Sequence, residues 1–144
     1  MEAILLIGIP SSGKTTFYQQ RWCDTHLRLC ADMLRLPSRL EKLFETAVDT
    51  RTQLVLDAPN LRKEDRKRFI EKAHKASYEV FAYYFSPNLT TALARNAARV
   101  DGYRLRVSAI EAAAGSIQPP SEDEGFDASF HVHEVPDGFT VDPL

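Results

Sequence analysis

Apolar segments and segments with helical spacing alternate along most of the chain. Residues 3–7 are apolar at every position, which predicts a strand buried on both faces. Residues 63–76 place apolar side chains at helical spacing between basic ones, which predicts an amphipathic helix with a solvated basic face that includes Arg66. The expected strands cover residues 3–7, 27–30, 53–57, 78–85 and 128–135, and the expected helices cover 14–24, 38–50, 63–76, 88–99 and 107–114, with Ser38 as the cap of the second helix.

This alternation predicts the fold class. Strands that alternate with helices are typical of a parallel sheet with helices on its faces. We therefore expect an α/β protein with a central parallel β-sheet of about five strands, flanked by helices. A length of 144 residues suits one domain, so residues 1–144 are expected to form a single unit.

Composition and charge narrow the class of protein. No apolar run approaches the roughly 18 residues of a membrane span, and residues 3–7 are too few for a signal-peptide core. Cys23 and Cys30 lack the close spacing of a zinc site, so we expect reduced thiols, no membrane partner and a cytoplasmic location. The segment 121–144 carries seven acidic side chains and no Lys or Arg, which leaves a basic surplus of five on the remainder. Such a surplus favours a polyanionic ligand.

The clearest chemical signal is the stretch GIPSSGKT at residues 8–15. It fits the pattern G-x-x-x-x-G-K-[ST], in which a glycine-rich loop between a strand and a helix cradles phosphates. Both the preceding strand and the following helix are predicted here, so we expect a P-loop NTPase or kinase fold that binds ATP. Lys14 would reach the β- and γ-phosphates, and the Thr15 hydroxyl would ligate Mg²⁺. The expected nucleotide-binding residues of the loop are Gly8, Pro10, Ser11, Ser12, Gly13, Lys14, Thr15 and Thr16.

Two acidic residues follow later strands at the edge where open α/β sheets bind ligands. Asp57 ends the strand 53–57, so its carboxylate can orient the Mg²⁺ shell; it can also serve as a turn cap. Asp32 follows the strand 27–30, and Arg35 comes three residues later on the same side of a starting helical turn. A kinase needs a carboxylate to take the acceptor hydroxyl's proton and a cation to hold the acceptor's own anion. The sequence lacks a guanine-reading Asn/Thr-Lys-x-Asp motif, which argues against a GTPase.

A third cluster contains arginines. Arg95 and Arg99 stand one helical turn apart, and alanines between them leave room for a phosphate. We expect residues 95–115 to form a small lid in which Arg99 stabilises charge on the transferring phosphoryl group. A solvated helix end is the alternative for these cations.

Together these motifs resemble the polynucleotide 5′-kinase type of phosphate-loop phosphotransferase, in the group of zeta-toxin and AAA-type P-loop kinase domains. The resemblance also includes the segments 55–60 and 120–127 and spans nearly the whole chain. It implies that Asp32 is the general base for a 5′-hydroxyl and that Arg35 holds the substrate's neighbouring phosphate. It further implies that Arg99 acts as the lid arginine and that Arg95 contacts the nucleotide. Ser11 and Pro59 stand where such kinases often have Gly and Thr.

The function expected from the sequence is therefore ATP-dependent transfer of the γ-phosphate to a hydroxyl, with the 5′-OH of a polynucleotide as the leading acceptor. A kinase for a small metabolite or nucleoside needs the same loop, base and lid and stays open. A non-catalytic ATP-binding regulatory module is a further alternative, although a sensor has no need of an acceptor-side pair such as Asp32 and Arg35.

Overall fold

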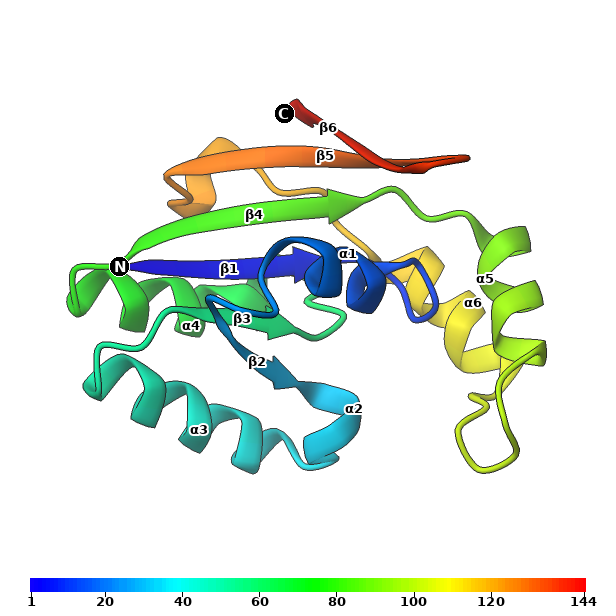
Figure 1. Cartoon of the computed structure of the whole chain (residues 1–144), viewed down its shortest axis with the longest axis horizontal. Coiled ribbons are helices and arrows are strands. Elements are labelled where there is room, and N and C mark those ends of the chain that lie inside the picture. Colours follow the sequence, from blue (N-terminus) through cyan, green and yellow to red (C-terminus); the bar gives the residue numbers. More distant parts are fainter.

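The computed structural model describes all residues, 1–144, and has a six-stranded sheet with the strand order β2-β3-β1-β4-β5-β6 (Figure 1). The first five of these strands are parallel, and β6 pairs antiparallel with β5. The predicted α/β fold with a parallel sheet is thus confirmed. In chain order the elements are β1 (Glu2–Ile7), α1 (Lys14–Arg21), β2 (Leu27–Cys30), α2 (Ala31–Leu34), α3 (Pro37–Asp49), β3 (Leu54–Asp57), α4 (Lys63–Lys75), β4 (Glu79–Phe85), α5 (Leu89–Ala97), α6 (Val107–Ser116), the 3₁₀ helix η1 (Glu122–Glu124), β5 (Ala128–Val135) and β6 (Gly138–Pro143).

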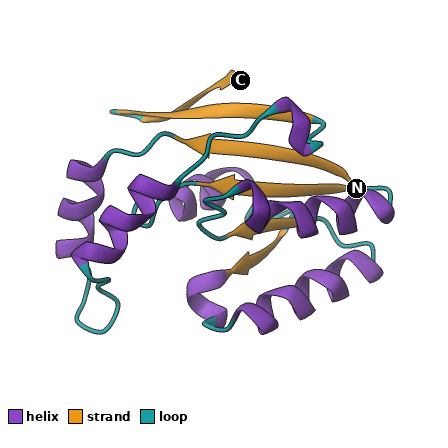
Figure 2. Cartoon of the chain, turned by 180° about the vertical axis from the view of Figure 1, so that it is seen from behind, coloured by secondary structure: helices purple, strands orange, loops and turns teal.

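The core lies on both faces of the central strand β1, as its unbroken apolar run predicts. On one face Ala3 and Leu5 pack with Phe44 of α3 and Phe69 of α4. On the other face Ile4 and Leu6 pack in a second cluster with Phe17 of α1. Figures 1 and 2 show these layers from opposite sides, with the helices distributed over both faces of the sheet.

Three local expectations are corrected by the structure. The helix α3 begins at Pro37, with Leu36 as its N-cap, so Ser38 is not the cap. Proline is favoured at a first helical position because the N–H of that position has no partner within the helix, so proline, which lacks an N–H, loses no hydrogen bond there. Residues 138–143, where no element was expected, form an additional strand, β6, so the sheet has six strands and not five. Arg66 is not on a solvated face either: it is fully buried, because it pairs with the buried Glu124.

The carboxyl ends of the parallel strands meet at one edge of the sheet, and the segments after them build the surroundings of the phosphate loop. The helices α5 and α6 pack together beyond this edge, where Ala92 and Ile110 join Ile9 of the loop in a small apolar cluster (Figure 1). The loop between these two helices, residues 98–106, falls within the expected lid. No helix has both the length and the apolar character needed to cross a membrane.

Candidate active site

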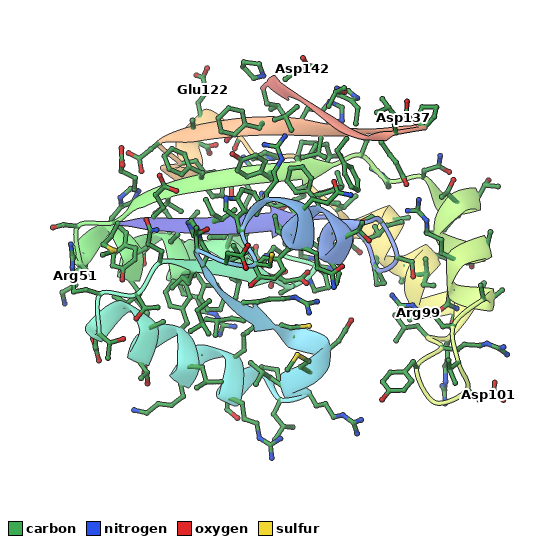
Figure 3. The ribbon with its side chains drawn as sticks, viewed as in Figure 1. Arg51, Arg99, Asp101, Glu122, Asp137 and Asp142 are labelled. Carbon is green, nitrogen blue, oxygen red and sulfur yellow. The ribbon has the colours of Figure 1, made fainter.

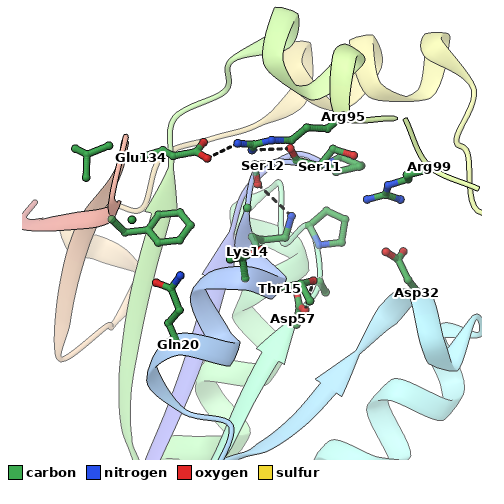
Figure 4. A pocket seen from close by; sticks show the side chains of 18 of the residues that line it. Ser11, Ser12, Lys14, Thr15, Gln20, Asp32, Asp57, Arg95, Arg99 and Glu134 are labelled. Carbon is green, nitrogen blue, oxygen red and sulfur yellow. Dashed lines mark hydrogen bonds and ion pairs between the residues drawn. The ribbon is translucent and has the colours of Figure 1, made fainter. Parts of the chain in front are cut away.

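A cavity of about 460 Å³ lies at the carboxyl edge of the sheet. It is formed by the phosphate loop, by the ends of β2 and β3, by the start of the lid, and by the hairpin between β5 and β6. Most of its lining is polar. The expected site residues that line it are Pro10, Ser11, Ser12, Gly13, Lys14, Thr15, Thr16, Asp32, Asp57, Arg95 and Arg99 (Figure 4).

The phosphate loop has the tight backbone that its glycines predict. A Cβ at Gly8 would lie 2.7 Å from the Ser12 hydroxyl oxygen and 3.1 Å from the Phe85 Cβ, so a larger residue there would displace both side chains. Gly13 has a φ of 93°, in the left-handed region, and the helix α1 begins at the next residue. The first residues of α1, 14–16, line the cavity, and the N–H groups of a first helical turn lack intrahelical partners, so they are available to an anion. The loop therefore fits a nucleotide phosphate chain, although Gly8 supports the loop rather than lining the cavity.

The side chain of Lys14 is folded back into this loop. Its Nζ donates to the carbonyl oxygens of Gly8 at 2.9 Å and of Ile9 at 2.8 Å. Only 8 % of the residue is exposed. Burial lowers the pKa of Lys14 to about 8, against the opposing influence of Asp57 and Asp32, which favour its charged form. The Lys14 amine therefore lies beside the phosphate loop, where burial favours its neutral form and the two carboxylates partly offset that effect.

Thr15 and Asp57, the two residues expected at the metal site, are in contact. The Thr15 hydroxyl donates to Asp57 Oδ2 at 3.2 Å, and the carboxylate is only 5 % exposed. Two hard oxygen ligands beside a phosphate cradle suit Mg²⁺, which is commonly held by one or two protein groups together with substrate phosphates. Nowhere in the chain do three or more His, Cys, Asp or Glu side chains form a metal-binding cluster.

Arg28 is a residue of this site that sequence reasoning missed. Its Nη2 donates to Asp57 Oδ2 at 2.6 Å and to the Thr15 hydroxyl at 2.8 Å, and its Nε donates to the same Asp57 oxygen at 2.8 Å. The signal available in the sequence was one charged residue within the otherwise apolar strand Leu27–Cys30. Its partner Asp57 is 29 positions away, so the pairing follows from the sheet and not from a local pattern.

Asp32 and Arg99 come from opposite walls of the cavity and both point into it (Figure 4). Asp32 lies in the short helix α2, directly after β2. Arg99 lies two residues beyond the end of α5, and its Nη1 donates to the Tyr103 carbonyl at 3.4 Å. Both side chains are close enough to Lys14 to affect its pKa, Asp32 raising it and Arg99 lowering it. The predicted base and lid arginine are thus brought together around the loop lysine.

Arg95 and the C-terminal hairpin close another side of the cavity. The Nη1 of Arg95 donates to the Ser11 carbonyl at 3.3 Å, and its Nη2 pairs with the carboxylate of Glu134 on β5. Phe139 of β6 lies against the loop, 3.3 Å from where a Cβ at Gly13 would be. Glu134 and Phe139 were not expected site residues. Figure 3 shows that the hairpin also carries Asp137 and Asp142, at the opposite end of the molecule from α3.

Arg35 is the one expected catalytic residue outside this cavity. It has a φ of 64°, which is uncommon for a residue with a side chain, and its exposed side chain lines a neighbouring cavity of about 280 Å³. Ala58 and Pro59 line both cavities, so the two adjoin each other. Asp32 and Arg35 therefore line different cavities, although they are only three positions apart.

A family model and several solved structures match the chain. The family model described as an AAA domain matches residues 25–120, about two thirds of the chain, including Asp32, Asp57, Arg95 and Arg99. The chain belongs to this AAA domain family. The phosphate loop at residues 8–15 precedes the matched segment. No curated protein sequence matches the chain.

Several solved structures share the fold of this AAA domain. Chaetomium thermophilum Kti12, in complex with ADP-AlF3, aligns with a TM-score of 0.66 and 19 % identity over 90 % of this chain and 87 % of that one. A chain of the PezAT toxin-antitoxin system of Streptococcus pneumoniae aligns with a TM-score of 0.64 and 16 % identity, over 90 % of this chain and 65 % of that one. The AvrRxo1-ORF1:AvrRxo1-ORF2 complex with sulphate ions gives a TM-score of 0.69 at 11 % identity, over 99 % of this chain and 57 % of that one. At these identities the likeness establishes the fold.

Proposed function

We propose that this AAA domain is an ATP-dependent kinase that transfers the γ-phosphate of ATP to the 5′-hydroxyl of a polynucleotide. The observation that carries the proposal is the position of Asp32, whose carboxylate points into the cavity opposite Arg99 and near the loop of Lys14 (Figure 4). An acceptor hydroxyl needs a carboxylate to take its proton, and a transferring phosphoryl group needs cations around it. A protein that only sensed nucleotide would need neither group at this place.

Each residue then has a role in the transfer. The N–H groups at the start of α1 and the ammonium of Lys14 hold the phosphates of ATP. Asp32 accepts the proton of the acceptor hydroxyl while that oxygen forms a bond to the γ-phosphorus. The bond from this phosphorus to the β,γ-bridging oxygen breaks, and its electron pair leaves on ADP. Arg99 stabilises the charge on the group in transit. A Mg²⁺ held by Thr15 and oriented by Asp57 would neutralise phosphate charge.

The adjoining cavity supports a place for the acceptor. Its lining combines an apolar floor, with Leu40 and Phe69 among its residues, and the cations Arg35 and Arg68 at its rim. A nucleotide offers the matching combination of a flat base and an anionic phosphate. Because Ala58 and Pro59 border both cavities, an acceptor seated here lies beside the donor site.

A kinase for a small hydroxyl compound is the second candidate. The observation in its favour is the size of the same cavity, since about 280 Å³ suits one small molecule or a single nucleotide. The acidic segment 121–144 also bears no cation that could follow a long phosphate backbone. Both candidates use Asp32 and Arg99 in the same roles.

The test is transfer of label from γ-labelled ATP with Mg²⁺. The acceptors are DNA and RNA oligonucleotides with a 5′-hydroxyl, the same oligonucleotides with a 5′-phosphate as matched controls, nucleosides, and small alcohols. We expect label on the 5′-hydroxyl oligonucleotides alone, with loss of transfer in Asp32→Asn and weaker use of the acceptor in Arg35→Ala. Label on a small alcohol or nucleoside would replace the first candidate by the second. Tight ATP binding without label on any acceptor would contradict both and favour a regulatory module.

A further inference from the structure

The guanidinium of Arg28 already binds both protein oxygens of the metal site. It donates to the Thr15 hydroxyl at 2.8 Å and, through Nη2 and Nε, to Asp57 Oδ2 at 2.6 and 2.8 Å. These are the two side chains that the loop and strand offer to Mg²⁺. A cation that is part of the chain and a cation from solution therefore have the same ligands.

Burial makes this arrangement important for the protein without nucleotide. Asp57 is 5 % exposed, and Arg28 is its only ion-pair partner. A buried carboxylate without a cation is strongly destabilising, so Arg28 provides the neutralising charge when no metal is bound. The guanidinium also lies over the ring of Tyr18, 5.6 Å from its centroid, which fixes its direction.

Charge repulsion makes the two cations competitors. A Mg²⁺ on the Thr15 hydroxyl would share that oxygen with the Arg28 Nη2. The two charges of the metal ion and the one charge of the guanidinium would then lie within a few ångströms of each other, and only the Asp57 carboxylate would offset them. Repulsion between charges at such distances is large inside a protein, where the effective dielectric constant is low. Arg28 can withdraw because β2 is an edge strand and the side chain is already 22 % exposed.

We propose that Arg28 is an internal competitor of Mg²⁺: it holds Thr15 and Asp57 in the nucleotide-free protein and releases them when Mg²⁺ arrives with the nucleotide. Arg28 then sets the Mg²⁺ concentration that the site requires and also protects the empty site from the unpaired charge of Asp57. The inference rests on the metal site of the proposed function, and it does not depend on the acceptor or on phosphoryl transfer.

The experiment measures thermal unfolding and calorimetric binding of ADP while Mg²⁺ is titrated. Arg28→Gln removes the competing charge. Arg28→Lys keeps the positive charge but replaces the forked guanidinium by one compact ammonium, and it serves as the test if the Gln variant is too unstable to fold. Arg21→Gln is the matched control, because Arg21 is exposed, lies over the Phe17 ring and makes no contact with Asp57. Asp57→Asn tests the metal site itself.

We expect Arg28→Gln to unfold at a lower temperature than the wild type in EDTA and to reach half-saturation at about five- to tenfold less Mg²⁺, a typical size for coupling between two binding events. Arg28→Lys is expected to lie between the two, and Arg21→Gln is expected to match the wild type. An unchanged or higher Mg²⁺ requirement in Arg28→Gln and Arg28→Lys, while Asp57→Asn weakens the response to Mg²⁺, would overturn the inference alone. A Mg²⁺ response that is unaffected by Asp57→Asn would overturn the metal site and the inference with it.

Discussion

Arg66 and Glu124 form a buried, two-pronged ion pair that ties α4 to the segment before β5. The Arg66 Nε donates to Glu124 Oε2 at 2.7 Å, and its Nη2 donates to Oε1 at 2.6 Å. The remaining Nη1 donates to the carbonyl oxygens of Asn60 at 3.0 Å and Gln118 at 2.8 Å. Arg66 thereby connects the loop after β3, the segment after α6 and the acidic segment. In the sequence this Glu belongs to the stretch that resembles related kinase domains, and its role in the structure is to hold the fold together.

Replacement of Glu124 by Gln is expected to lower the free energy of unfolding by about 3–5 kcal/mol, because it leaves the buried charge of Arg66 without its partner. Urea denaturation followed by circular dichroism measures the change. Asp123→Asn is the matched control. Asp123 is the residue next to Glu124 and pairs with Lys63, but both of these side chains are largely exposed. The control is expected to unfold at the same urea concentration as the wild type. An equal loss of stability in the two variants would contradict the role assigned to the buried pair.

The lowered pKa of Lys14 predicts opposite effects of pH on stability and on nucleotide binding. The folded protein releases the Lys14 proton near pH 8, whereas the unfolded chain keeps it to about 10.5. Below pH 8 the fold must bury the charged amine, so this cost is fully present there and is relieved as the pH rises through 8. In the proposed function the Lys14 ammonium holds the nucleotide phosphates, so the affinity for ADP should fall over the same range.

Melting temperatures with and without ADP between pH 7 and 10 test both the expected rise in stability and the expected fall in ADP affinity. We subtract the values of Lys14→Met, which lacks the titrating group, to remove the contribution of every other group. The difference should show a rise in the stability of the free protein above pH 8 and a smaller shift on ADP addition. If the ADP-induced shift of the wild type follows that of Lys14→Met in parallel at all pH values, the amine does not contact the nucleotide.

Arg99 is expected to act on the rate of transfer more than on nucleotide affinity, because it reaches the cavity from the lid. Loss of one charge-stabilising donor typically lowers kcat by about a hundredfold or more, so Arg99→Ala should show a loss of this size with a nearly unchanged ATP Kd. Arg106→Ala serves as the control, since Arg106 is an exposed lid residue that does not line the cavity. Equal rates in the two variants would show that the lid arginine has no part in the reaction.

The sequence predicted those parts of the site that are encoded within a few consecutive residues. The loop at residues 8–15 and the carboxylates of Asp32 and Asp57 follow directly from strands, and the carboxyl ends of parallel strands meet at one edge. Knowledge of the strand order was not needed for this. The same local character explains why the burial of β1 was predicted well.

The parts that were missed depend on pairings between distant positions. Arg28 meets Asp57 only because β2 lies beside β3, and Glu134 meets Arg95 only because β5 lies beside β4, the strand that leads to α5. Arg66 has the spacing of a solvated side chain, and only the partner 58 positions away makes its burial favourable. Arg35 was assigned to the Asp32 site from its helical spacing, but the helix α2 ends at Leu34 and Arg35 has a positive φ.

The most direct test of the account is to measure ATP affinity and γ-phosphate transfer on the same Asp32→Asn protein. Asparagine keeps the shape of the side chain but cannot take up the acceptor's proton. We therefore expect an ATP Kd close to that of the wild type and a transfer rate about 10²- to 10⁴-fold lower, the usual contribution of a general base. Wild-type transfer by Asp32→Asn would contradict the assignment of the base. Absence of transfer by the wild-type protein to every hydroxyl acceptor would contradict the kinase function as a whole.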